Sequence, residues 1–176
     1  MNTNKVWFVT GASKGLGLAL VKKLIANNYR VAATSRNIGA LKKEIGLDSA
    51  SFLPLAMDIT SDEAVKEAIA KVVAHFGQLD VIVNNAGYSQ IGTQEELSSE
   101  EVKRNFEVNV FGLLHVVRHA APYLRKQCAG HIFNISSIGG FVANFPGFGI
   151  YCATKFAVAG LSESLAEEMN TFGVNT

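Results

Sequence analysis

The sequence predicts an α/β protein built on one doubly wound parallel sheet, with the strand order 3-2-1-4-5 in the 176 residues given. Two observations lead to this class. Short apolar runs alternate with longer segments of helical periodicity, a pattern typical of a parallel sheet covered by helices on both faces. No linker or low-complexity segment interrupts this alternation, so we expect residues 1–176 to form a single domain.

Five apolar runs are the predicted strands, each bounded by residues that favour turns. They are residues 5–10, 30–35, 52–57, 79–84 and 131–136. Right-handed crossovers between consecutive strands place all of them in one sheet. Ligands of such sheets bind beyond the carboxyl ends of the strands, where the winding reverses between strands one and four.

Helical periodicity predicts helices over residues 15–27, 38–45, 98–127 and 151–172, and one more that begins at Thr60. Thr60 and Glu63 have the spacing of a capping box, and so do Ser98 and Glu101. These helices connect successive strands, as parallel pairing requires.

The segment between the first strand and the first helix, residues 10–17, has the sequence TGASKGLG. Unpaired N–H groups and partial positive charge at a helix N-terminus bind phosphate. We expect Gly11 to permit the sharp turn, Gly15 to let the backbone approach a pyrophosphate, and Gly17 to let the helix pack closely on the sheet. The alternative is a purely structural turn. No Gly-Lys-Ser/Thr ends the segment, which excludes the phosphate loop of nucleoside triphosphatases.

Polar or flexible residues follow each of the five predicted strands. They are Ser13 and Lys14, then Ser35 and Arg36, then Asp58, then the NNAG of residues 84–87, and finally Ser136 and Ser137. Because the carboxyl ends of parallel strands meet at one edge of the sheet, these segments outline a binding crevice.

The residues after the second strand indicate which nucleotide this crevice binds. A carboxylate at this point usually holds a ribose 2′-hydroxyl, but here Ser35 is followed by Arg36, and no acid is nearer than Glu44. Arg36 suits a 2′-phosphate and Lys14 adds a second cation, so NADP(H) is predicted in preference to NAD(H). The alternative is that both are solvated surface charges. Asp58 is predicted either to accept from an adenine amino group or to cap the next helix.

Tyr151 and Lys155 lie one helical turn apart, where the last helix opens beside the crevice. A free phenol is a poor acid–base group at neutral pH, and a nearby ammonium favours its phenolate form. Ser137, just after the fifth strand, could donate to a substrate oxygen as that oxygen gains charge. Placed over a nicotinamide, these three side chains suit the interconversion of an alcohol and a carbonyl compound.

Together these motifs make the chain resemble the short-chain dehydrogenase/reductase family along its whole length. Residues 10–17 resemble the family's TGxxxGxG, residues 84–87 its NNAG, and Tyr151-x-x-x-Lys155 its active-site pair. The resemblance implies that Tyr151 is the general acid–base, that Ser137 orients the substrate, and that Lys155 holds the nicotinamide ribose. It also implies that Asn109, within the sequence VNV, holds a water in a proton relay.

The same resemblance implies a Rossmann-like, NADP(H)-dependent oxidoreductase that acts on a small carbonyl compound or alcohol. Its cofactor-binding residues would be Gly11, Ser13, Lys14, Gly15, Leu16, Gly17, Ser35, Arg36, Asp58, Ile59, Asn85, Ala86, Gly87, Tyr151 and Lys155. The loop at 141–150 would border the substrate, and its Phe141, Phe145 and Phe148 predict an apolar ketone or secondary alcohol; the alternative is packing under the loop or at a subunit contact. The family further implies a homodimer or homotetramer through the helices at 98–127 and 151–172, whose apolar stripes could equally face an intrachain core.

The sequence departs from the family pattern in two places. The segment between Ser137 and Tyr151 is slightly longer than is common, which leaves Ser136 as a rival for the catalytic serine. The chain stops at residues 173–176, where the family begins its sixth strand, so we expect the domain to be incomplete at its C-terminus, without most of a substrate lid. Strand five would then have an unpaired edge and uncovered apolar faces. The second function considered is therefore a catalytically silent nucleotide-binding or regulatory domain.

Composition argues against several classes of function. The formal net charge of +1 predicts no attraction to nucleic acid or to an anionic membrane, and no apolar run is long enough to span a bilayer. Cys128 and Cys152 lack metal or redox spacing, and a strand lies close to the N-terminus in place of a signal peptide, so a cytoplasmic protein with reduced thiols is expected. His115 and His119 lie one helical turn apart without the glutamate of the zinc-protease motif, so no metal site is expected.

Overall fold

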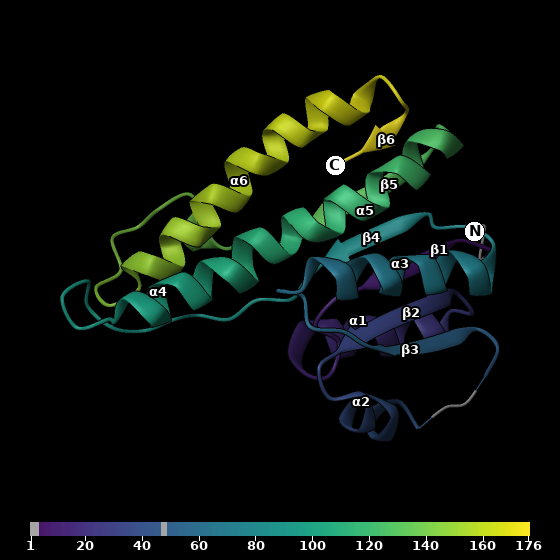
Figure 1. Ribbon diagram of the computed structural model, residues 1–176, viewed down its shortest axis with the longest axis horizontal. Helices are drawn as coiled ribbons and strands as arrows, with labels where there is room; N and C mark the ends of the chain where they lie inside the picture. The colour runs from purple at the N-terminus through teal and green to yellow at the C-terminus, as the bar shows by residue number, and fades with distance from the viewer. Residues whose placement is uncertain (1–3, 47–48) are drawn as a thin grey trace.

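The computed structural model describes residues 4–46 and 49–176, and at its centre is a parallel sheet in the order β3-β2-β1-β4-β5-β6 (Figure 1). The strands are β1 (Val6–Val9), β2 (Arg30–Ser35), β3 (Phe52–Ala56), β4 (Val81–Asn84), β5 (Gly130–Asn134) and β6 (Val174–Asn175). The predicted fold class and the order of the first five strands are confirmed. The short β6 extends the sheet at residues 174–175, where the family resemblance places the start of a sixth strand.

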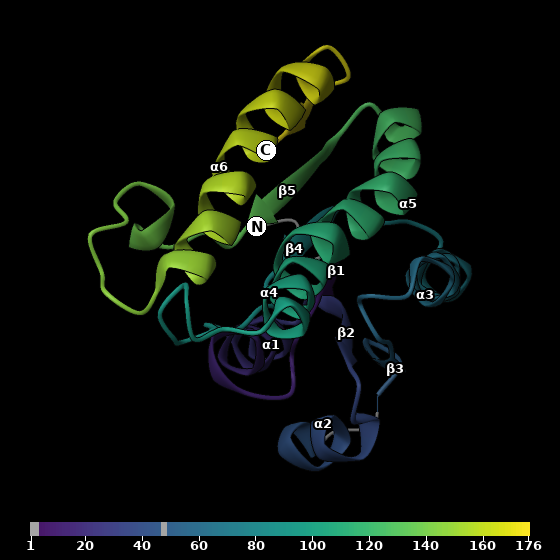
Figure 2. The ribbon, with the colours of Figure 1, turned by 60° about the vertical axis from the view of Figure 1, so that its left-hand side comes forward.

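Helices pack on both faces of this sheet, and Figure 2 shows α1 and α3 on opposite sides of β1 and β2. The helices are α1 (Gly15–Ala26), α2 (Ile38–Ile45), α3 (Asp62–Phe76), α4 (Ser99–Phe106), α5 (Gly112–Gln127) and α6 (Gly149–Asn170), with a π-helical segment η1 (Glu107–Phe111) and a 3-10 turn η2 (Ile138–Gly140). Helices α3, α5 and α6 bury one face around Phe8 and Ile82, while α1 and α2 bury the other around Val9 and Val31.

The register of the strands brings their carboxyl ends to one edge of the sheet. Val9 of β1 pairs with Ala33 of β2 and with Val83 of β4. The next residue of β4, Asn84, pairs with Asn134 of β5. The loops that carry the predicted polar residues therefore open on the same side of the molecule.

The N-cap of α3 lies one residue later than predicted. Its N-cap is Ser61, whose hydroxyl accepts from the N–H of Ala64. The hydroxyl of Thr60 instead donates to Asp58 Oδ1 at 2.8 Å. The predicted capping box that starts at Thr60 is therefore wrong, because a neighbouring carboxylate engages that hydroxyl.

The single helix expected over residues 98–127 is interrupted. Its capping box of Ser98 and Glu101 is confirmed, with hydrogen bonds in both directions. After α4, however, the chain passes through the π-helical η1 before α5 begins. Such wide turns are rare and occur frequently at functional sites, and Asn109 lies buried within this one.

The far edge of the sheet is only partly covered. β6 pairs with β5 at Gly130 and His131, so the expected unpaired edge is wrong for these two residues. Farther along, Phe133 remains 47% exposed and stacks on the Trp7 ring at 6.4 Å between centroids. Within the described residues, no helix has both the length and the apolar composition that crossing a membrane requires.

Candidate active site

A cleft of about 730 Å³ lies beyond the carboxyl ends of the strands. The sequence-predicted residues that line it are Gly11, Ser13, Lys14, Gly15, Leu16, Ser35, Arg36, Asp58, Ile59, Asn85, Ala86, Gly87, Tyr151 and Lys155. Three other predicted residues, Gly17, Asn109 and Ser137, are not among its lining residues. The structure thus brings together segments that are separated by more than a hundred positions in the sequence.

The three glycines of the first turn have different geometries. Gly11 has a φ of +66°, and a Cβ there would lie 2.7 Å from the Cα of Ala86. A Cβ on Gly17 would lie 2.5 Å from Asn85 Nδ2, so only glycine lets α1 start this close to the end of β4. Gly15 has a φ of +59° and faces open space. The tight turn and the close packing are as predicted, and the approach of a pyrophosphate at Gly15 stays a prediction.

A buried threonine ties this turn to the end of β4. The Thr10 hydroxyl accepts from the N–H groups of Asn85 and Ala86, at 3.1 and 3.0 Å. Asn85 Nδ2 donates in return to the carbonyl oxygens of Thr10 and Gly11, at 2.9 and 3.1 Å. These four bonds fix the turn in place, so a ligand would meet a preformed cradle.

The N-terminus of α1 is open to an anion. Its N-cap is Lys14, whose side chain makes no capping hydrogen bond, and its first turn carries no acidic residue. By contrast, Ser61 and Ser98 cap α3 and α4 with their hydroxyls. The first N–H groups of α1 therefore lack a side-chain acceptor and retain the partial positive charge of the helix end.

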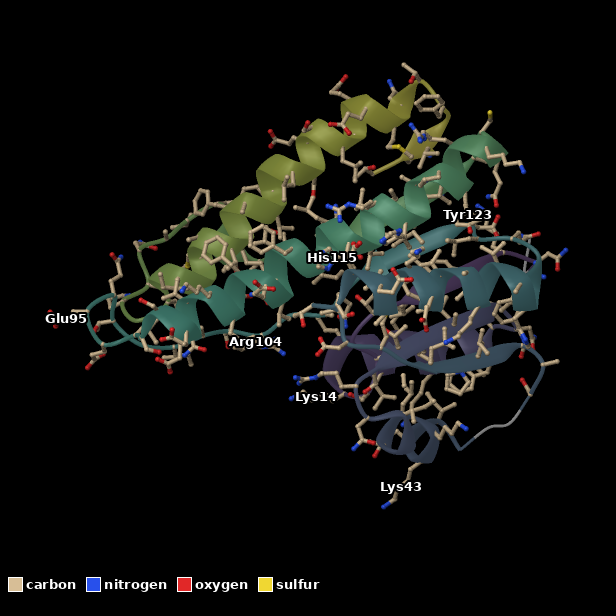
Figure 3. All side chains as sticks on the ribbon, in the orientation of Figure 1. Lys14, Lys43, Glu95, Arg104, His115 and Tyr123 are labelled. Atoms are coloured by element: carbon tan, nitrogen blue, oxygen red, sulfur yellow. The ribbon has the colours of Figure 1, made fainter. Side chains whose placement is uncertain are left out.

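The cleft is lined by more cations than acids. Its lysines and arginines are Lys14, Arg36, Arg104 and Lys155, and among the lining residues Asp58 alone is acidic. Lys14 and Arg104, labelled in Figure 3, come from the start of α1 and from α4. This excess of positive charge suits an anionic ligand.

Asp58, which lines the cleft, is held as a carboxylate. The N–H of Thr60 donates to Asp58 Oδ1 at 3.0 Å, and this hydrogen bond is the main cause of a lowered pKa for Asp58. The guanidinium groups of Arg104 and Arg36 lower that pKa further. Because Ser61 caps α3, the prediction that Asp58 caps this helix is wrong, and its contact with an adenine stays a prediction.

Lys155 and Tyr151 both line the cleft and lie on the first turns of α6. Lys155 is only 7% exposed, and its Nζ donates to the carbonyl oxygen of Ile135 at 2.6 Å. The same Nζ lies 5.9 Å from the centroid of the Tyr151 ring. Burial lowers the pKa of Lys155, since water no longer solvates its ammonium fully.

Ser137 lies beside Tyr151 without lining the cleft. Its hydroxyl accepts from the N–H of Gly139 at 3.2 Å. A Cβ on Gly139 would lie 3.7 Å from both Ser137 Oγ and Tyr151 Cε1, which places the two side chains around one glycine. The rival Ser136 does line the cleft, but its buried Oγ has no partner among the described residues and would lie 2.7 Å from a Cβ on Gly140.

Asn109 does not line the cleft but hydrogen-bonds the loop that follows β4. Its Nδ2 donates to the carbonyl oxygen of Tyr88 and to Thr154 Oγ1, at 2.9 and 3.0 Å. Its Oδ1 accepts from the N–H of Tyr88 at 3.0 Å. The amide thus joins this loop to α6, and its role in holding a water stays a prediction.

The loop between η2 and α6 presents aromatic rings to solvent. Phe141 is 73% exposed and Phe145 is also exposed, so these two rings do not pack under the loop. Phe148 meets the Tyr151 ring edge-on, with centroids 6.4 Å apart. An apolar surface therefore lies next to the tyrosine.

Sequence reasoning did not find several residues of this cleft. They are Thr34, Met57, Tyr88, Ser89, Arg104, Val108 and Ile135, whereas Ser136 lines the cleft, as its place after the fifth predicted strand leads us to expect. Arg104 shares the helical periodicity of an ordinary solvated face, so nothing in the pattern of α4 distinguishes it. Tyr88 directly follows the NNAG motif, and this position is the one feature of the sequence that could have placed it in the cleft.

The histidines on α5 have separate partners. His119 Nε2 lies 3.0 Å from Asp62 Oδ1, and His115 Nδ1 lies 3.1 Å from the carbonyl oxygen of Ile59. Across residues 4–46 and 49–176, no group of three or more His, Cys, Asp or Glu side chains could hold a metal ion.

The sequence matches the short chain dehydrogenase family over residues 5–176, and the chain therefore belongs to that family. It is 40% identical over 177 residues to oxidoreductase calM of Penicillium decumbens, covering 97% of this chain and 58% of that protein. It is 36% identical over 171 residues to oxidoreductase BOA17 of Botryotinia fuckeliana, covering 97% of this chain and 62% of that protein. The chain thus spans about three fifths of the length of these relatives.

Solved structures share the fold closely. A short-chain dehydrogenase from Streptomyces avermitilis superposes with a TM-score of 0.92 at 39% identity, covering 97% of this chain and 62% of its own. ElxO with NADP bound gives 0.90 at 32% identity, covering 97% and 70%. An NAD⁺-bound xylitol dehydrogenase gives 0.86 at 27% identity, covering 97% and 67%. Because these last two hold different nicotinamide cofactors, the likeness alone does not choose between them.

Proposed function

We propose that this chain is an NADP(H)-dependent oxidoreductase that interconverts a carbonyl compound and a secondary alcohol. One observation carries the proposal: the buried ammonium of Lys155 lies 5.9 Å from the Tyr151 ring, in the same cleft that begins at the glycine turn. A candidate acid–base pair and a phosphate-binding turn in one cleft suit a reaction between a bound nucleotide and a small substrate.

The residues of the cleft fit a phosphorylated dinucleotide. The uncapped N–H groups of α1 and the open space at Gly15 suit a pyrophosphate. Arg36 and Lys14 suit a 2′-phosphate, because a guanidinium can donate two parallel hydrogen bonds to it. The Asp58 carboxylate can accept from an adenine amino group, and Lys155 can donate to ribose hydroxyls.

The side chains around the substrate would handle the proton. When bound, the nicotinamide supplies or accepts the hydride. In the direction of reduction, Tyr151 gives its phenol proton to the carbonyl oxygen while the carbonyl carbon gains the hydride, and a secondary alcohol results. The Lys155 ammonium stabilises the phenolate that remains, and Ser137 donates a hydrogen bond to the reacting oxygen. Because both N–H groups of the Asn109 side-chain amide already donate to protein groups, a relay water would bind either its side-chain or its main-chain carbonyl oxygen.

Removing the phenol hydroxyl tests this assignment. We expect Tyr151→Phe to lower NADPH consumption across a panel of apolar ketones by about 10²–10⁴-fold, the usual contribution of a positioned acid–base group. Tyr123→Phe on α5, whose ring lies outside the cleft, is the matched control and should leave the rate unchanged. Equal rates for wild type and Tyr151→Phe would contradict the acid–base role. NADPH binding without any turnover by the wild type would favour the second function, a catalytically silent nucleotide-binding or regulatory domain.

The preference for NADP(H) has its own test. Arg36→Ala should weaken NADPH binding by about 10–100-fold while changing NADH binding less than about threefold, because only the former carries the 2′-phosphate. Arg125→Ala, at the end of α5 and outside the cleft, controls for the loss of an arginine. Equal losses for the two nucleotides in Arg36→Ala would overturn the assignment.

We further propose that residues 1–176 form a single dinucleotide-binding domain that works in the cytoplasm as a homodimer or homotetramer. Supporting the association, Phe111 in η1 and Phe156 in α6 are exposed on the helices that the family uses for subunit contacts. Supporting the location, Cys128 and Cys152 are both free thiols.

A further inference from the structure

Two buried asparagines, Asn105 on α4 and Asn109 in η1, hold the main chain of one loop residue. Asn105 is fully buried and Asn109 is 3% exposed. Their Nδ2 atoms donate to the carbonyl oxygen of Tyr88, at 3.1 and 2.9 Å. The N–H of Tyr88 donates back to Asn109 Oδ1 at 3.0 Å. Three hydrogen bonds from one stretch of helix therefore converge on a single residue, an arrangement we call the Tyr88 clamp.

The Tyr88 clamp is the main support of the loop between β4 and α4. In the described part of the chain, the main-chain hydrogen bonds of residues 87–91 are all made by Tyr88. The next such bond comes at Gly92, whose N–H donates to the carbonyl oxygen of Gly147 at 2.9 Å. The position of the intervening loop therefore depends on the clamp.

This loop forms the wall of the cleft beside the candidate acid–base pair. Gly87, Tyr88 and Ser89 all line the cleft. A Cβ on Gly87 would lie 3.1 Å from Asn109 Oδ1 and 3.8 Å from Lys155 Nζ. A shift of the Tyr88 carbonyl would consequently change the space next to the lysine ammonium.

The amide of Asn105 is unfavourable for packing alone. Its Oδ1 is buried and has no hydrogen-bond partner among the described residues. Burial of an unpaired carbonyl opposes folding, and an apolar side chain such as leucine, which has the same branching, would avoid that cost. An asparagine at this fully buried position therefore indicates a specific task for its N–H group, and the bond to Tyr88 supplies one.

We propose that Asn105 is a positioning residue of the active site. It fixes the Tyr88 carbonyl, together with Asn109, and so holds the 87–89 wall at the distance from Lys155 that turnover requires. Its effect on turnover rests on the function proposed above, whereas the clamp itself does not. Asn105 touches neither substrate nor cofactor in this assignment.

The clamp is tested by hydrogen exchange in the protein without cofactor. Asn105→Leu keeps the branching and the number of side-chain heavy atoms and removes the donor. Tyr88 carries the one N–H of the described residues 87–91 with a hydrogen-bond acceptor, so its amide should exchange about tenfold faster than in the wild type, while the amides of β1 and β4 keep their rates. In steady-state kinetics the same variant should lose about tenfold in kcat with little change in the KM for NADPH, because the α1 and Arg36 contacts are untouched.

A second variant gives a signature that a purely structural role would lack. In Asn105→Asp, an ionised carboxylate would face the Tyr88 carbonyl, acceptor against acceptor, and the clamp would open. The protonated carboxyl can donate to that carbonyl, and burial raises the pKa of a carboxyl. We therefore expect the kcat of Asn105→Asp, relative to wild type, to rise as pH falls from about 8 to about 5.5, and the ratio for Asn105→Leu to stay flat.

The control is Val65→Ala, which creates a cavity in α3 away from the clamp and should lower stability without changing kcat. Unchanged exchange of the Tyr88 amide in Asn105→Leu, a flat pH ratio for Asn105→Asp, or an equal loss of kcat in Val65→Ala would overturn the proposal. If the wild type shows no turnover, the proposed function fails, and the exchange rates alone decide the clamp. If Asn105→Leu does not fold, Asn105→Asp carries both measurements.

Discussion

At the scale of single residues, the positive charge that the proposed function requires of Lys155 conflicts with the burial of its side chain. The side chain is buried, and its ammonium donates to one main-chain carbonyl, that of Ile135. Burial lowers its pKa below the ordinary 10.5, which measures the cost of keeping this charge inside the protein. An anionic partner in the cleft, either a phenolate or a bound nucleotide, would offset that cost. Under the proposed function, this buried charge would serve catalysis while it lowers the stability of the free protein.

This conflict predicts how Lys155→Met behaves with pH. The unfolded chain binds the lysine proton more tightly than the folded protein, so wild-type stability rises as pH increases from the folded pKa toward 10.5. We expect Lys155→Met to raise Tm by about 2–4 °C at pH 7 and to abolish turnover, with the gain in Tm shrinking near pH 10. Thermal unfolding at both pH values measures this, with the exposed Lys103→Met as control. A gain that stays constant with pH would contradict the argument.

The residues that sequence could place are those whose neighbours are fixed by local geometry. Gly11 and Gly17 were placed by the turn between β1 and α1, and Tyr151 and Lys155 by the spacing of one helical turn. Arg104 could not be placed, because its presence in the cleft depends on how α4 crosses the strand ends. Such tertiary contacts leave no periodic signal in the chain.

At the scale of elements, the start of α1 lacks the capping features that stabilise a helix end. An N-cap of Ser, Thr, Asp or Asn is strongly preferred, yet the cap here is Lys14, a cation at the positive end of the helix dipole. The same chain uses serine caps at α3 and α4, so the difference is local. A phosphate would supply the missing acceptor and the missing negative charge.

Lys14→Asp should therefore separate stability from binding. The new carboxylate can accept from the first-turn N–H groups and oppose the dipole, which should stabilise the free protein by about 1 kcal/mol. NADPH binding should weaken at least about tenfold, because the carboxylate occupies the phosphate donors and repels the ligand. Thermal unfolding and NADPH titration measure the two effects. Lys14→Ala controls for loss of the cation, and equal NADPH affinity in the two variants would show that the helix end does not hold the phosphate.

The helices also show which features of an element can be predicted from the sequence and which cannot. Ser98 and Glu101 identified the start of α4, because a capping box is a local pattern of four residues. The π-helical η1 left no such pattern, since Glu107–Phe111 continues the apolar periodicity of its neighbours. Its wide turn places Asn109 against Tyr88 and Thr154, and those partners come from distant parts of the chain.

At the scale of the whole molecule, two of the exposed apolar surfaces formed by the described residues are candidates for self-association. The first is the outer part of the sheet, where β6 pairs with only Gly130 and His131 and leaves Phe133 and Ile135 exposed. The second lies on the helices and includes Phe111 in η1 and Phe156 in α6. Figure 1 shows that α6 runs alongside α4 and α5. A partly unpaired strand edge favours open-ended association, whereas two helical faces can close on a second copy with twofold symmetry.

Substituting a charged residue on each surface distinguishes which of the two mediates subunit association. We expect Phe156→Glu to dissociate a defined homodimer or homotetramer into monomers, because an unpaired carboxylate cannot be buried between helices. Phe133→Lys should instead leave that oligomer intact and reduce only the concentration-dependent aggregation, since a lysine on an exposed edge opposes strand-to-strand pairing. Sedimentation velocity over a range of protein concentrations distinguishes the outcomes, and NADPH affinity should be unchanged in both variants because neither ring lines the cleft. If Phe133→Lys dissociates the defined oligomer while Phe156→Glu preserves it, the subunit contact lies at the sheet edge and the helical interface is wrong.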